Sequence, residues 1–128
     1  MKTSSNPEAI HPPVGLYSHQ IKVEGQPRWL VMAGQVGRTA DGTVPPDPIE
    51  QLTLALENVS RNLEAADMSV DDVVKLTWYL VGDIDADRRR EMTAKWLGDH
   101  RPCSTLLYVS RLAAPEYKVE VDAWACRS

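Results

Sequence analysis

The first part of the chain alternates apolar and polar residues in the manner of β-strands. From Leu16 to Glu24 every second residue is apolar or aromatic, which is typical of a strand with one buried face. Residues 25–27 have the composition of a turn, so we expect residues 28–36 to return as the second arm of a hairpin. A tight-turn dipeptide and two prolines predict a loop over residues 37–46, with room for one extra strand. Residues 1–13 carry three prolines, and we expect a loose arm or an edge segment there.

The periodicity then changes to that of a helix. Asp47 can accept a hydrogen bond as the N-cap, and Pro48 suits the first helical position. Glu50 can complete a reciprocal cap with Asp47. The apolar residues that follow form one stripe with a period of 3.6 residues: Ile49, Leu52, Leu56, Val59, Leu63 and Ala66.

The second half predicts three strands and another helix. Residues 73–81 are rich in β-branched and aromatic side chains, as a central strand requires. Residues 85–97 form a helical segment that ends at a glycine, and Pro102 prevents its restart. Residues 104–110 and 117–126 are two further strands. The residues of the second helix expected to point inward are Ile84, Met92 and Trp96.

These elements predict one α+β domain over residues 1–128, with a mostly antiparallel sheet and two helices packed on one face. The other face is not purely polar. Either Leu107 and Val109 or Leu106 and Tyr108 must face away from the helices, depending on the register. Such uncovered apolar surface predicts self-association.

Composition and charge exclude several classes of function. The 128 residues carry a net charge of −4, which argues against non-specific binding of nucleic acid. The one basic run, Arg88 to Arg90, follows several aspartates, and we interpret it as a solvated helix face. Cys103 and Cys126 have no pairing or metal-binding spacing, so we expect free thiols in a reducing cytoplasm. We find no signal peptide, membrane span, phosphate-binding loop or metal-ligand cluster, and we expect a soluble cytoplasmic protein without metal or cofactor.

Four short segments carry a family resemblance: Gly15-Leu16-Tyr17-Ser18, Ala33-Gly34-Gln35-Val36, Pro102-Cys103-Ser104-Thr105 and Val119-Glu120-Val121-Asp122-Ala123. In this order and at these separations they resemble the RidA/YjgF family of enamine and imine deaminases. The resemblance implies a RidA-like, chorismate-mutase-like fold. It also implies a homotrimer with small-molecule clefts between subunits.

The resemblance also assigns roles to individual residues. Tyr17 matches a tyrosine that closes over the ligand, although a core aromatic of the first strand is an equal alternative. Gly34 lets a ligand or a second backbone approach closely, and Gln35 is expected to hold the local backbone. Asp122 matches the carboxylate that positions or activates the hydrolytic water. The alternative for Asp122 is a solvated acid on a strand face.

Ser104 stands where the family motif Pro-x-Arg-Ser places arginine. In relatives that arginine binds a substrate carboxylate with two parallel hydrogen bonds, which one hydroxyl cannot replace. Cys103 and Ser104 are expected to shape an anion-binding turn through their backbone amides. Arg101 or Arg111 could supply the missing guanidinium, and the sequence does not choose between them.

The favoured function is therefore a hydrolytic deaminase for an enamine or imine, with a specificity altered by Ser104 toward neutral or differently charged substrates. One alternative is a non-catalytic small-molecule-binding module of the same family. Another is a pathway-specific deaminase or hydrolase in the catabolism of aromatic or nitrogen compounds. An endoribonuclease activity, a label given to some relatives, is disfavoured by the acidic charge.

Overall fold

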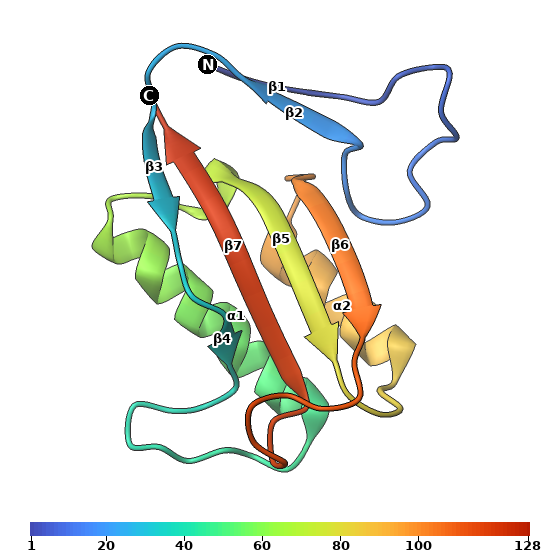
Figure 1. Cartoon of the computed structure of the whole chain (residues 1–128), viewed down its shortest axis with the longest axis vertical. Helices are drawn as coiled ribbons and strands as arrows, with labels where there is room; N and C mark the ends of the chain where they lie inside the picture. Colours follow the sequence, from blue (N-terminus) through green and yellow to red (C-terminus); the bar gives the residue numbers. More distant parts are fainter.

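A computed structural model describes all residues, 1–128 (Figure 1). Strands and helices follow one another much as the sequence patterns predict. The elements in chain order are β1 (Lys2–Ser5), β2 (Gln20–Val23), β3 (Arg28–Val31), β4 (Gln35–Val36), α1 (Pro48–Ala65), the short 3-10 helix η1 (Val70–Asp72), β5 (Val73–Leu80), α2 (Ala86–Leu97), β6 (Cys103–Tyr108) and β7 (Val119–Arg127).

One mixed sheet forms the centre of the fold. Its strands lie in the order β3, β7, β5, β6, and β4 also pairs with β7. All pairings in this sheet are antiparallel except the parallel β5–β6 pair, which α2 connects. Both helices cover the same face, as Figure 1 shows, so the predicted α+β architecture is confirmed. We call the uncovered side of the sheet the open face.

The core lies between the helices and the covered face of the sheet. It consists of the apolar stripe of α1 and of alternate residues of β5 and β7. Every second residue of β7 from Val119 to Ala125 is fully buried there, whereas the residues between them face the open side. The members of α1 in this core are Ile49, Leu52, Ala55, Leu56, Val59 and Leu63.

The helix ends follow their local sequence signals. The Asp47 carboxylate accepts the N–H of Ile49 at 3.1 Å, which confirms the predicted N-cap of α1. The reciprocal bond expected from Glu50 does not form. Asp85 caps α2 by accepting the N–H groups of Asp87 and Arg88, and Gly98 with a positive φ of 58° follows the helix end.

The predicted hairpin of residues 16–24 and 28–36 is wrong. β2 pairs with β1, so residues 2–5 form a strand, and β3 pairs with the C-terminal part of β7. The physical reason is that Leu30 lies beside Ala125 in this register and reaches the core, which a hairpin with the outlying β2 would prevent. No strand forms in residues 37–46, and β4 precedes them.

The register of β6 decides which of its side chains lie away from the helices. Leu106 pairs with Trp78 and therefore lies on the helix side, whereas Leu107 pairs with Tyr79 and lies on the open face. The open face also carries Trp29 and Trp124, each about half exposed, whose rings meet edge to face at 6.3 Å. An exposed apolar patch thus lies on the uncovered sheet.

Candidate functional site

The structure separates the predicted site residues into two groups on opposite faces of the sheet. Ser104 pairs with Leu76 and lies on the helix side, as Tyr17 does in the pocket described below. Asp122 pairs with Thr77 and lies on the open face. A single ligand cannot touch both groups within one chain, because the sheet lies between them.

The first group lines a pocket between the edge strand β6, helix α2 and the segment before β2, which we call the β6–α2 pocket. Its volume is about 670 Å³, and one side is open to solvent. Within it, the hydroxyl of Ser104 accepts the indole N–H of Trp78 at 2.7 Å. The hydroxyl of Tyr17 accepts the backbone N–H of Val14 at 3.2 Å. Both hydroxyls keep their own hydrogen for a further acceptor.

An arginine that the sequence analysis placed on a solvated helix face also lines this pocket. The neighbours of Arg89 form ion pairs: Arg88 with Asp47 at 3.0 Å, and Arg90, which also lines the pocket, with Asp87 at 3.8 Å. Arg89 instead has a buried Nε atom without any hydrogen-bond partner. The expectation of a solvated face is therefore wrong for Arg89.

Neither arginine that the sequence suggested as a substitute lies in the pocket. Arg101 uses Nη1 to donate to the carbonyl oxygens of Gly98 and His100, at 2.7 and 2.8 Å. Arg111 is exposed and does not line the pocket. The expected anion-binding turn is also absent, because Cys103 and Ser104 both belong to strand β6.

The second group gathers on the open face around β4 and β7. Gly34 lies so close to Glu120 that a Cβ atom at position 34 would overlap the Glu120 carboxylate. The Tyr79 hydroxyl donates to Asp122 Oδ2 at 3.0 Å, and this hydrogen bond to the carboxylate raises the pKa of Tyr79 above its ordinary value of 10.0. Glu120 and Asp122 are thus two acids on the same strand face, one strand repeat apart.

Two further predicted residues have clear positions. Cys103 is a half-buried free thiol that pairs with Lys75, so its side chain lies on the open face, opposite to Ser104. Gln35 donates from Nε2 to the carbonyl oxygen of Ala33 at 2.8 Å, which confirms that it holds the local backbone. Glu120 was not among the predicted site residues, although its place two residues before Asp122 puts it on the same strand face.

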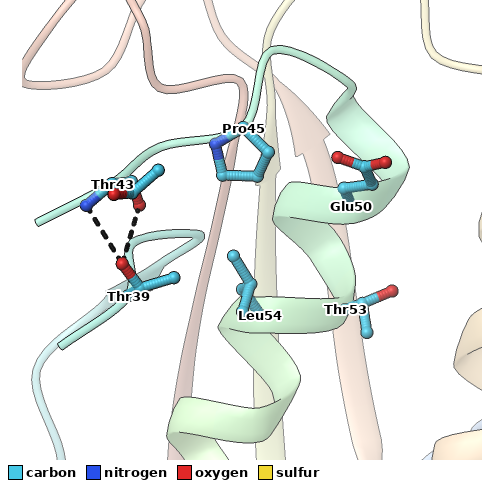
Figure 2. Close-up of a pocket in the computed structure, with 6 residues that line it drawn as sticks. All are labelled: Thr39, Thr43, Pro45, Glu50, Thr53 and Leu54. Carbon is cyan, nitrogen blue, oxygen red and sulfur yellow. Dashed lines mark hydrogen bonds between the residues drawn. The ribbon is translucent and has the colours of Figure 1, made fainter. Parts of the chain in front are cut away.

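A second pocket, of about 350 Å³, lies between the loop before α1 and the first turns of that helix (Figure 2). It contains none of the predicted site residues. Its loop is closed by Thr39, whose hydroxyl accepts the N–H of Thr43 at 3.0 Å and donates its hydrogen to Asp41 Oδ1, with the carbonyl oxygen of Thr43 3.4 Å away. Because these polar groups already satisfy one another, we assign no function to this pocket.

No group of three or more histidine, cysteine, aspartate or glutamate side chains is placed to hold a metal ion. No helix has the length and apolar character needed to span a membrane.

Comparison with known proteins connects this geometry to a family. The family model described as Endoribonuclease L-PSP matches residues 6–127. A RutC family protein of Pyrococcus horikoshii is 34% identical over 116 residues, which cover 88% of each chain. TdcF of Escherichia coli, provisionally named a reactive intermediate deaminase, is 32% identical over 90 residues, covering 68% of this chain and 69% of TdcF.

Solved structures share the whole fold. A Rid family protein of unknown function from Yersinia pestis superposes with a TM-score of 0.86 and 30% identity, covering 98% of both chains. The crystal structure of E. coli TdcF with bound serine gives a TM-score of 0.72 at 28% identity, covering 98% of this chain and 96% of TdcF. The chain belongs to the RidA/YjgF family, the family of the Endoribonuclease L-PSP model.

Proposed function

We propose that this protein is a hydrolytic deaminase that converts an enamine or imine to a carbonyl compound, with a substrate preference altered at position 104. Water adds to the carbon of the C=N bond, the amine nitrogen takes a proton, and ammonia leaves as the C=O bond forms. The provisional deaminase name of a relative supports this reaction class. The observation that carries the proposal is the pair of acids on β7, Glu120 and Asp122, beside the side-chain-free position Gly34.

These two acids can divide the proton transfers of the reaction. Hydrolysis of a C=N bond needs one group to take a proton from water and another to give a proton to the departing nitrogen. The hydrogen bond from Tyr79 fixes the orientation of Asp122, which we keep as the proposed catalytic acid of the sequence analysis. Glu120 is the second candidate, because Gly34 has no side chain that would cover the Glu120 carboxylate.

A complete site requires a second copy of the chain. Tyr17 and Ser104 lie on the helix side of the sheet, whereas Gly34 and the two acids lie on the open face. We therefore propose a homotrimer in which the β6–α2 pocket of one subunit adjoins the open face of its neighbour. The aromatic patch of Trp29 and Trp124 supports such an assembly, because it leaves apolar surface to be covered. The ligand is a small molecule rather than nucleic acid, given the net charge of −4.

The test is the rate at which imines, generated in the assay by an amino-acid oxidase, give ammonia and carbonyl product. Asp122→Asn and Glu120→Gln should each lower the enzyme-dependent rate by about 100-fold or more, since each removes a proton-transfer group. Glu116→Gln, which changes an exposed acid outside the site, is the matched control and should keep the rate.

Two results would contradict the proposal. An enzyme-dependent rate that survives both acid substitutions would remove β7 from the mechanism. Binding of imines or their products without any turnover would favour the non-catalytic binding module instead.

A further inference from the structure

The β6–α2 pocket contains one cation without a partner. Three charged residues line it: Arg89, Arg90 and Glu91. Arg90 is paired with Asp87, and Glu91 forms no ion pair with either arginine. Arg89 forms no ion pair, and its Nε–H is a buried donor without a hydrogen-bond partner. An unpartnered buried donor destabilises the empty pocket, because it has given up water without gaining another acceptor.

We propose that Arg89 binds the anionic group of the ligand, a small organic carboxylate, in place of the arginine expected at position 104. This proposal rests on the function proposed above and specifies its substrate class. The Nε–H and one Nη–H of a guanidinium form a fork that matches the two oxygens of a carboxylate. Because protein atoms cover Nε, the Arg89 side chain must turn toward the pocket opening for a carboxylate to supply the acceptor that Nε lacks.

The remaining pocket wall fits the rest of such a ligand. Apolar side chains from four parts of the chain contribute to it: Leu16, Trp78, Leu97 and Leu106. Ser104 and Tyr17 each accept one hydrogen bond from the protein and can donate their own hydrogen to a ligand oxygen or nitrogen. The wall thus fits a short apolar substituent, with polar contacts for the group next to it.

The anion contact therefore comes from helix α2 instead of strand β6. Ser104, which lacks a guanidinium, predicted a preference for neutral or differently charged imines. With Arg89 in the same pocket, the substrate can keep its carboxylate. The altered specificity then means that the carboxylate is bound nearer to α2 than in relatives with arginine on β6.

The experiment measures binding of benzoate and of its neutral isostere benzamide to the full chain by isothermal titration calorimetry. The wild type should bind benzoate more tightly than benzamide. Arg89→Gln should weaken benzoate binding by roughly 10- to 100-fold, as expected for a lost charge-assisted pair. The same substitution should leave the affinity for benzamide unchanged. Lys95→Gln, which removes a charge from the same helix outside the pocket, is the matched control.

Three companion variants separate the loss of this contact from a folding defect. Arg89→Lys keeps the charge without the fork and should bind benzoate with intermediate affinity. Adding Ser104→Arg to Arg89→Gln should restore benzoate binding, because it returns a guanidinium to the same pocket. Glu91→Gln should strengthen benzoate binding by removing a negative charge from the wall.

The outcomes distinguish this inference from the proposed function. Unchanged benzoate affinity in Arg89→Gln would overturn the inference, and imine turnover that depends on Glu120 or Asp122 would still support the deaminase. Benzoate binding that depends on Arg89, in a protein without turnover, would support the inference and reject the deaminase.

Discussion

Some residues of the candidate site could be identified from the sequence, and others could not. Tyr17, Gly34 and Ser104 stand in short segments whose order is distinctive, so the sequence identified them. Arg89 was missed because an arginine run in an amphipathic helix has no local signal that separates inward from outward members. Only the tertiary structure shows that Arg89 has a buried, unpaired Nε beside the pocket while Arg88 and Arg90 form ion pairs.

The contact between Tyr79 and Asp122 gives a prediction at this scale. Donation to the carboxylate raises the pKa of Tyr79 above 10.0, so we expect Asp122→Asn to lower it toward that value. The folded state holds the tyrosine proton more tightly than the unfolded state does. This stabilisation is therefore complete below the unfolded pKa and is lost as the pH rises through the folded pKa.

Ultraviolet difference spectra of the phenolate would follow this titration, with Tyr79→Phe identifying the contribution of Tyr79. An unchanged Tyr79 titration in Asp122→Asn would show that the hydrogen bond does not form in solution.

Helices, whose start and end signals lie in neighbouring residues, were predicted well. Strand pairing, which depends on a partner strand far away in the sequence, was predicted poorly. The caps of α1 and α2 depend on neighbouring residues, and both helices begin within one residue of the predicted start. The partner of β3 depends on a strand almost a hundred residues later in the chain, which no local pattern specifies. The hairpin prediction failed for this reason.

Helix α1 offers a prediction about an element and its connections. Gln51 is fully buried, and its Nε2 donates to the carbonyl oxygens of Pro45 and Glu116, each at 2.9 Å. Its Oε1 accepts the N–H of Lys118 at 2.8 Å, so this one side chain joins α1 to the loop before it and to the start of β7. Gln51→Ala would leave three backbone groups unsatisfied and should lower the free energy of unfolding by about 3 kcal/mol.

Urea denaturation would measure this change. Glu57→Ala, on the exposed side of the same helix, is the control and should change stability by less than about 0.5 kcal/mol. Equal effects of the two substitutions would show that the Gln51 contacts do not connect the elements.

At the scale of the whole molecule, the sequence predicted self-association from apolar residues that two helices could not cover. The structure places such residues on the open face: Trp29, Val31 and Trp124, with Leu107 nearer the other edge. The proposed trimer would cover this apolar surface, and it would also bring the two groups of site residues together. Without a second copy, Ser104 and Asp122 stay on opposite faces of one sheet.

Trp124→Glu tests this assembly. A charge in the centre of the patch should convert a trimer to monomers, because burying an unpaired carboxylate is costly. Light scattering coupled to size-exclusion chromatography would give the mass. Ile10→Glu, at an exposed apolar residue outside the sheet, should stay trimeric. A monomeric wild type, or a trimer that tolerates Trp124→Glu, would contradict the proposed interface.

The position of β7 in the chain affects how the protein can be made. This strand pairs with β3, β4 and β5, yet it follows all of them in sequence (Figure 1). During synthesis on a ribosome, the earlier strands must therefore wait with unsatisfied edges until residues 119–127 emerge. We expect nascent chains arrested before residue 119 to bind holdase chaperones and to resist compaction, and the sheet to close only once β7 has emerged.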